Sequence, residues 1–369
     1  MKTKPMLGIM TIHAPGIPPF PEKSFYKQIV QTGQSEGIPV IIFHPNAIDE
    51  QTQTVKGYTL NQAGNWMSVT TSLPAFIYDR CFYIGKGLNR RYKPYVLKLK
   101  ENKNIQFLGL GLKGKWQLYQ MVSAHPVLSQ FLPHTDILNR NKQLSDWLNR
   151  YKSIILKPIN GSLGMGIIKI TEKSGRAYDI EGRDLLNKSF QSSVSNLSSL
   201  YQFIQPFIRR WKYLIQPYLT LTSKQGVPFD MRIFMQKDGT GQWISIGKAV
   251  RIGQKNSITS NLHGGGKACC FRDFLDRNYN REQIEGILSR VKILEELLPP
   301  YIESQHGQLL ELGIDTGIDQ DGRVWLLEVN SKPGRQIFEQ INDQDALRKS
   351  QINPVYYARY LMQTRSRRI

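Results

Sequence analysis

The chain has 369 residues, of which 40% are hydrophobic and 21% are charged, a composition typical of a globular protein. This composition excludes a disordered tail protein, and no segment approaches the ~18 consecutive apolar residues of a membrane span. Lysine and arginine outnumber the acids by 49 to 29, which gives a formal net charge of +20. Such a charge predicts attraction to nucleic acid, an anionic membrane or an acidic substrate, with a solvated basic surface as the alternative.

The N-terminal region reads as an α/β unit. Apolar runs at Leu7–Ile12, Pro39–Phe43 and Pro74–Arg80 are candidate strands, and Glu22–Glu36 has the apolar spacing of a helix. This alternation predicts a small, mostly parallel sheet. Residues Arg90–Asn104 are basic and polar, and we place a domain boundary there.

Two further units follow along the chain. In the first, Ser153–Ile170 reads as strand, glycine-rich loop and strand, and the serine-rich Lys188–Leu200 as a loop leading into a helix. In the second, the turn Lys237–Gly241 predicts a hairpin, and Gln283–Ser304 is the clearest amphipathic helix. We therefore expect an α/β (α+β) protein with three domains, at residues 1–105, 112–214 and 215–369.

The cysteines and the chain start bear on location. Cys81, Cys269 and Cys270 form no CxxC or Cys/His metal spacing, and the first residues lack the apolar stretch of a signal peptide. A reducing cytoplasm fits best.

The glycine-rich loop could bind phosphate. Gly161, Gly164 and Gly166 expose backbone N–H groups, and Lys157 precedes them at the end of a predicted strand. The spacing matches neither a P-loop nor a dinucleotide fingerprint, so a plain glycine-rich hairpin remains the alternative.

A group of acids near the C-terminus suggests a metal site. Asp321-Gly322 is a hairpin turn signal, so Asp315 and Glu328 could face each other on antiparallel strands. Asn330 lies two residues beyond Glu328 and projects to the same face. Two carboxylates and an amide oxygen suit Mg²⁺, and the alternative is an exposed hairpin with ordinary acids.

Two arginines and an asparagine complete the candidate residues. Arg232 and Arg251 lie in predicted strands and could bind phosphate or carboxylate in a bidentate way, and Asn261 opens a glycine-rich NLHGGGK segment.

The ordered set of these motifs resembles the ATP-grasp superfamily. Lys157-Pro158 before the glycine loop, Asp230-x-Arg232, and Asp315 followed by Glu328-x-Asn330 and Pro333-Gly334 match its signature. The segment LGIDTGIDQDGRVWLLEVNSKPGR is similar to YheC/YheD-type endospore-coat-associated ATP-grasp proteins. The resemblance covers essentially the whole chain and implies an N-terminal pre-ATP-grasp domain and two α+β subdomains that grip ATP.

The resemblance also implies roles for residues. Lys115 (or, as the weaker candidate, Lys113) and Lys157 would contact ATP phosphates under the loop Gly161, Ser162, Gly164 and Gly166. The adenine hinge would be Gln216, Pro217, Tyr218 and Leu219. Mg²⁺, or Mn²⁺, would be held by Asp315, Glu328 and Asn330, and Arg232, Arg251 and Asn261 would hold the transferred phosphate.

Two positions depart from the family pattern. Gln216 stands where an acid is frequent, and Gly313 stands where ligase-type relatives often have an arginine two residues before the first metal aspartate. The second departure leaves the oxyanion stabiliser open, with Arg251 as the replacement.

The implied reaction is carboxylate–amine, or carboxylate–thiol, ligation through an acyl phosphate. The alternative is a structural, spore-coat-associated ATP-binding protein without ligase activity, in the forespore or spore coat. A nucleic-acid-binding protein is a third reading, but no RNP-like or zinc-finger motif is present. The expected partners are small-molecule or peptide substrates that carry a carboxylate and an amine.

Overall fold

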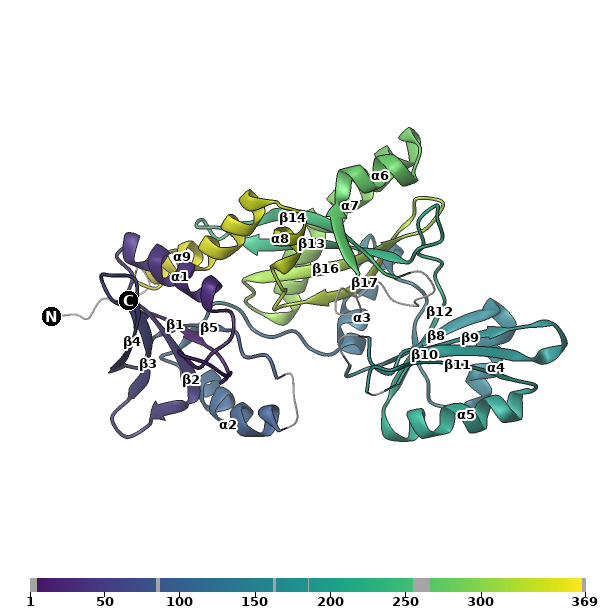
Figure 1. Ribbon diagram of the computed structural model, residues 1–369, viewed down its shortest axis with the longest axis horizontal. Helices are drawn as coiled ribbons and strands as arrows, with labels where there is room; N and C mark the ends of the chain where they lie inside the picture. Colours follow the sequence, from purple (N-terminus) through teal and green to yellow (C-terminus); the bar gives the residue numbers. More distant parts are fainter. Residues whose placement is uncertain (1–4, 84–86, 162–163, 185, 255–265, 367–369) are drawn as a thin grey trace.

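A computed structural model describes residues 5–83, 87–161, 164–184, 186–254 and 266–366. These residues form three mixed helix-and-sheet parts, which confirms the predicted α+β fold class. Figure 1 shows the C-terminal part, in green and yellow, between the purple N-terminal part and the teal central part. No helix in the described ranges is long and apolar enough to cross a membrane.

The N-terminal part is a six-stranded sheet in the order β4-β3-β2-β1-β5-β6. The three predicted strands, β1 (Leu7–Met10), β2 (Val40–Asp49) and β5 (Phe76–Asp79), run parallel, and the short β6 (Gln106–Phe107), which was not predicted, joins them in parallel beside β5. Two strands that the sequence did not predict, β3 (Thr54–Leu60) and β4 (Trp66–Ser72), extend one edge in antiparallel fashion. Helix α1 (Lys23–Ser35) confirms the predicted helix.

The basic segment that we interpreted as a boundary is in fact helix α2 (Leu88–Glu101). Tyr92, Val96 and Leu99, spaced by four and three residues, are buried against the N-terminal sheet, while the lysines between them and the two arginines before Tyr92 are exposed. The high density of charge concealed this narrow apolar stripe.

The central part is a second six-stranded sheet, in the order β11-β10-β9-β8-β12-β7. Its strands are β7 (Asp136–Ile137), β8 (Ser153–Pro158), β9 (Ile168–Glu172), β10 (Tyr178–Arg183), β11 (Ser189–Val194) and β12 (Tyr213–Pro217). Helices α4 (Asn141–Tyr151) and α5 (Leu197–Arg210) supply the apolar cover of one face. The serine-rich Lys188–Leu200, predicted as a loop leading into a helix, does lead into α5, but its residues Ser189–Val194 pair with β10 and form the edge strand β11 instead of a loop.

The C-terminal part is a five-stranded antiparallel sheet in the order β15-β14-β13-β16-β17. Its strands are β13 (Phe229–Lys237), β14 (Trp243–Ile252), β15 (Lys267–Cys270), β16 (Glu311–Ile318) and β17 (Val324–Asn330). Its helices are α6 (Phe271–Asn278), α7 (Arg281–His306), α8 (Gln336–Gln340) and α9 (Gln344–Ser366), and α3 (Lys115–Ser123) packs beside α7. The predicted hairpin β13–β14 and the predicted helix α7 are confirmed.

The two faces of this sheet are used differently. Met231, Ile233 and Ile314 point toward α7 and form the apolar core with it. The alternate residues of the same strands point to the other face, because side chains alternate along a strand. Helices α8 and α9 cover one end of that face, where Phe234 contacts Phe338. The other end carries the polar residues of the site.

Helix α9 belongs to two parts of the fold at once. Its residues Val355, Ala358 and Leu361 are buried in one apolar cluster with Ile9 and Val30 of the N-terminal part. Figure 1 shows α9 lying beside α1. We call this cluster the shared core, and it joins the N-terminal and C-terminal parts, whereas the central part has an apolar cluster of its own.

Candidate functional site

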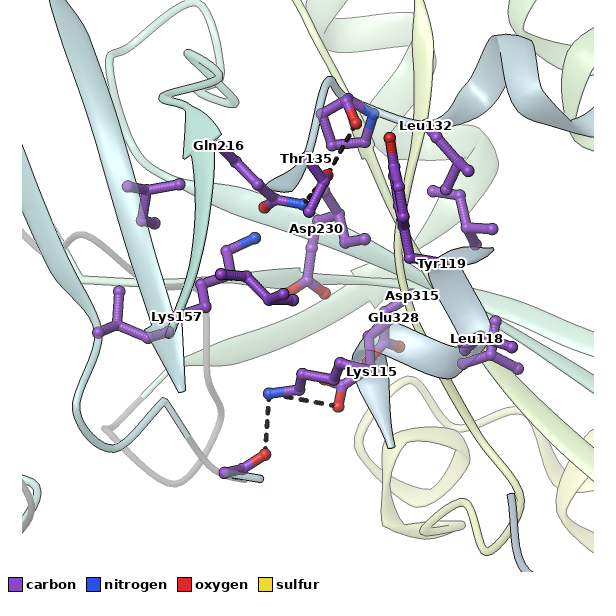
Figure 2. A pocket seen from close by; sticks show the side chains of 18 of the residues that line it. Lys115, Leu118, Tyr119, Leu132, Thr135, Lys157, Gln216, Asp230, Asp315 and Glu328 are labelled. Carbon is purple, nitrogen blue, oxygen red and sulfur yellow. Dashed lines mark hydrogen bonds and ion pairs between the residues drawn. The ribbon is translucent and has the colours of Figure 1, made fainter. Parts of the chain in front are cut away.

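A cavity of about 460 Å³ lies between the central and C-terminal sheets and is also lined by helix α3. Its volume is within the range of small-molecule sites. Most of the predicted site residues line it: Lys115, Lys157, Gly161, Gly164, Gln216, Pro217, Tyr218, Leu219, Arg251, Asp315, Glu328 and Asn330. Lys113, the weaker candidate for the first lysine, lines it too. Figure 2 shows Lys115 and Lys157 entering it together with Asp315 and Glu328.

Strand alternation explains how the central sheet presents Lys157. Ile154 and Leu156 of β8 are buried toward α4 and α5, whereas Ile155 and Lys157 line the cavity. Burial and the nearby Lys115 ammonium lower the pKa of Lys157 to about 8, and Glu328 partly offsets them. No described residue forms an ion pair or hydrogen bond with this ammonium, so its charge is available to an anion.

Lys115 begins helix α3 and bridges the two sides of the cavity. Its Nζ donates to the carbonyl oxygen of Gly161 at 2.8 Å and lies 3.8 Å from Oε1 of Glu328. Lys115 therefore contacts both the first residue of the glycine loop and a predicted metal ligand. The contact with Gly161 was not predicted, because the residues are 46 positions apart.

The strand register places Asp315 directly opposite Glu328, as predicted. A β-bulge interrupts the pairing between Asp315 and Thr316, where Leu327 is an extra, unpaired residue on β17. The bulge shifts the alternation of β17, so that Leu326 points into the core while Glu328 is free to share the face of Asp315. Without the extra residue, Leu326 and Glu328 would lie on the same face of a regular strand.

Asp315 is the electrostatic centre of the site, with a side chain only 8% exposed. Arg232 donates to both of its oxygens, through Nε to Oδ1 and through Nη2 to Oδ2 at 2.7 Å. Nη2 of Arg251 lies 3.1 Å from Oδ1, and Nδ2 of Asn330 lies 3.3 Å from Oδ2. Burial opposes ionisation, but the two guanidinium groups hold the pKa of Asp315 below its usual value.

Asp230 is a site residue that we did not single out. It faces Arg251 across strands β13 and β14 and accepts from its Nε at 2.5 Å. Burial opposes the charge of Arg251, yet Asp315 and Asp230 together raise its pKa above the usual value. The Asp-x-Arg spacing of Asp230 and Arg232 was the available signal, since residues two apart on a strand share a face.

Arg232 occupies the space that a side chain at position 313 would need. A Cβ added at Gly313 would lie 2.8 Å from Cβ of Pro333 and 3.2 Å from Cδ of Arg232. A side chain at position 313 would therefore be crowded first by Pro333 and then by Arg232 from the neighbouring strand.

This crowding leads to a prediction. We expect Gly313→Ala to lower the free energy of unfolding by about 1–3 kcal/mol through overpacking, measured by urea denaturation. Gly334→Ala is the matched control, since a Cβ there meets nothing within 4 Å. Equal stability of the two variants would contradict the steric explanation.

The predicted adenine hinge contributes mainly backbone. The Gln216 side chain is already engaged, since its Nε2 donates to Oγ1 of Thr135 at 2.7 Å, and Figure 2 shows this bond. The Tyr218 N–H donates to the carbonyl of Ser153 at 3.0 Å. The N–H of Leu219 donates to no described acceptor and remains available at the cavity wall.

Three predicted residues are not brought into the cavity wall by the described structure. Gly166 lies beyond it, with its N–H bonded to the carbonyl of Asp184 at 3.1 Å. Ser162 and Asn261 lie outside the described residues. Arg232 is a fourth: it does not line the cavity itself but donates to Asp315, which does.

A family model described as YheC/D-like ATP-grasp matches residues 104–361. The endospore coat-associated protein YheC of Bacillus subtilis (strain 168) is 34% identical over 318 residues, which cover 85% of this chain and 86% of that relative. The endospore coat-associated protein YheD of the same strain is 29% identical over 333 residues, which cover 88% of this chain and 71% of that relative. The crystal structure of D-cycloserine synthetase DcsG is similar in fold, with a TM-score of 0.54, 12% identity, and coverage of 97% of this chain and 99% of that chain.

Proposed function

Because the chain belongs to the YheC/D-like ATP-grasp family, we propose that it is an ATP- and Mg²⁺-dependent ligase. It would join a carboxylate to an amine, or to a thiol, through an acyl phosphate. One observation carries the proposal. Two lysines and two carboxylates with an amide face each other across a single cavity, between two sheets that come from different parts of the chain.

The donor set fits a magnesium ion. Asp315, Glu328 and Asn330 offer two carboxylates and an amide oxygen, which are the hard ligands that Mg²⁺, or Mn²⁺, prefers. Asp315 already accepts four donors, which fill its lone-pair sites. A half-turn of the Asn330 amide would remove one donor from Asp315 and present the amide oxygen instead. Bound there, the ion would neutralise phosphate charge.

The chain's own cations would do the remaining electrostatic work. Lys157 and Lys115 would bind the phosphates of ATP, and the Leu219 N–H would hold adenine. Arg232 and Arg251, fixed by Asp315 and Asp230, would stabilise the charge on the phosphoryl group as it moves to the substrate carboxylate. ADP leaves, and attack by the amine then releases inorganic phosphate, so no side-chain nucleophile is required.

The relatives named as coat-associated favour a second candidate. We infer that this chain is made in the cytoplasm and becomes associated with the endospore coat. The alternative to the ligase is therefore a structural coat-associated protein that binds ATP but catalyses no ligation. The net charge of +20 would suit an acidic substrate, such as a peptide rich in carboxylates, as well as it would suit a nucleic acid, but the chain carries no RNP-like or zinc-finger motif of a specific nucleic-acid-binding protein.

The proposal predicts nucleotide binding that depends on the metal. Calorimetry with a non-hydrolysable ATP analogue should show weak binding in chelator that Mg²⁺ strengthens, and Glu328→Ala should weaken the binding in Mg²⁺ by about 100-fold, since a metal ligand is lost. Phosphate release should then rise with one pair among amino acids, dipeptides and polyglutamate. Nucleotide binding with no turnover of every pair tested would favour the structural candidate. A lack of Mg²⁺-dependent binding would contradict both the ligase and the structural ATP-binding protein.

A further inference from the structure

The segment that follows Asn330 leaves the site and runs to the N-terminal part. Ser331–Arg335 has no regular secondary structure, yet three of its side chains have partners in other parts of the fold. Oγ of Ser331 accepts from the backbone N–H of Leu112 at 3.0 Å. We call Ser331–Arg335 the strap.

Lys332 ties the strap to the carboxyl end of strand β5. Its Nζ lies 2.7 Å from Oδ1 of Asp79 and donates to the carbonyl of Cys81 at 3.0 Å. The Asp79 side chain is 7% exposed, and its Oδ1 also accepts from the Cys81 N–H at 2.9 Å. The acceptor is therefore itself held rigidly by its own backbone.

Arg335 ties the other end of the strap into a buried polar network. Its Nη2 lies 2.5 Å from Oε2 of Glu311 and donates to the hydroxyl of Tyr78 at 3.1 Å. Arg80 lies between Glu311 and Glu22, at 3.1 Å and 2.6 Å. Tyr78, Arg80 and Glu22 come from the N-terminal part, whereas Glu311 begins strand β16, which also carries Asp315.

The strap is short and pressed against the site. Lys332 is two residues beyond Asn330, and Pro333 lies over Gly313, the position paired with Asn330 across the strands. Only Ser331 separates Lys332 from Asn330, so few backbone dihedrals lie between the ion pair of Lys332 and the predicted metal ligand.

Holding the two parts together does not explain these ion pairs. The shared core already joins the parts, and Arg359 of α9 pairs with Glu36 beside α1. Buried ion pairs add little stability compared with apolar side chains of similar volume, but they fix geometry. The polar ties are therefore better explained by the placement of the strap.

We propose that Lys332 and Arg335 are positioning residues that use the N-terminal part as a fixed anchor for Asn330. The role of Asn330 as a metal ligand rests on the proposed function, whereas the anchoring of the strap does not. The N-terminal part would then set the geometry of the nucleotide site as well as any substrate site of its own.

The first experiment measures the anchoring without nucleotide. We expect Lys332→Met to accelerate amide hydrogen exchange at Glu328–Ser331 by about tenfold in the full chain. The matched control is Arg359→Met, which removes an ion pair between the same two parts without touching the strap, and should leave these amides unchanged. The conservative variant Lys332→Arg, which keeps a cationic donor opposite Asp79, should retain slow exchange. Unchanged exchange in Lys332→Met, or equal acceleration in the control, would overturn the proposal.

The second experiment measures the consequence for the metal. Lys332→Met should weaken Mg²⁺-dependent binding of the ATP analogue by about tenfold, whereas its binding in chelator should not change. Equal loss in both conditions, or no loss in either, would contradict a role through Asn330. If the unaltered protein shows no Mg²⁺-dependent binding, the proposed function fails, while the exchange experiment still decides whether the strap is anchored.

Discussion

Replacing Asp315 with asparagine should lower the free energy of unfolding by about 3 kcal/mol and abolish Mg²⁺-dependent nucleotide binding. The carboxylate is the shared partner of Arg232 and Arg251 in a site that is almost fully buried. Removing one partner of a buried ion pair leaves an uncompensated charge, which costs ~3–5 kcal/mol. We expect the lower end, because Arg251 keeps Asp230. Urea denaturation followed by circular dichroism measures the change.

Glu328→Gln is the matched variant for this prediction. Glu328 is the other predicted carboxylate ligand, but its side chain is 34% exposed and its nearest described cation, Lys115, is 3.8 Å away. Such a pair contributes roughly 0–1 kcal/mol, so stability should hardly change while Mg²⁺-dependent binding is lost. Equal destabilisation by the two variants would show that Asp315 has no special structural role.

Replacing Lys157 with methionine should stabilise the protein and weaken nucleotide binding by about 100-fold. Burial and Lys115 lower the pKa of Lys157 to about 8, below its value in an unfolded chain. The protonated lysine is therefore a cost to the folded state, on the order of 3 kcal/mol below pH 8. The same charge, without a described partner in the cavity, is what an ATP phosphate would bind.

The pH dependence gives this prediction its sign. Between the folded pKa of about 8 and the higher unfolded value, the unfolded chain binds more protons, so the unaltered protein gains stability as pH rises. The advantage of Lys157→Met should be constant below pH 8 and vanish by about pH 10.5. Lys248→Met is the control, because Lys248 is paired with Glu295 at 2.6 Å and its loss should destabilise. A stability gain for Lys157→Met that persists above pH 10.5 would contradict the electrostatic cause.

The sequence predicts the facing of Asp315 and Glu328 because a hairpin turn and a two-residue period are local signals. It does not predict the bulge at Leu327, since VWLLEVN reads as a continuous strand and no residue in it demands an extra position. It also misses the strap and its anchors. Lys332 and Asp79 are 253 positions apart in the chain, and nothing in either neighbourhood indicates the other.

Charge patterns were the least reliable guide. The run Arg90–Asn104 suggested a boundary, but its apolar residues at helical spacing are enough to dock α2 on the N-terminal sheet. Conversely, the buried network of Arg80, Glu311 and Arg335 lies among residues that composition alone would place on the surface. Both the docking of α2 and the burial of this network depend on contacts between residues far apart in the chain, which no local sequence pattern indicates.

The shared core has a consequence for how the protein is made. Strands β1 and β5 of the N-terminal sheet precede α9 by a long stretch of chain, although α9 supplies part of the apolar cover of this sheet. At ~5–20 residues per second, that cover leaves the ribosome tens of seconds after strand β5. During this interval an apolar surface of the N-terminal part is exposed to chaperones or to other nascent chains. It is covered only when α9 packs against it.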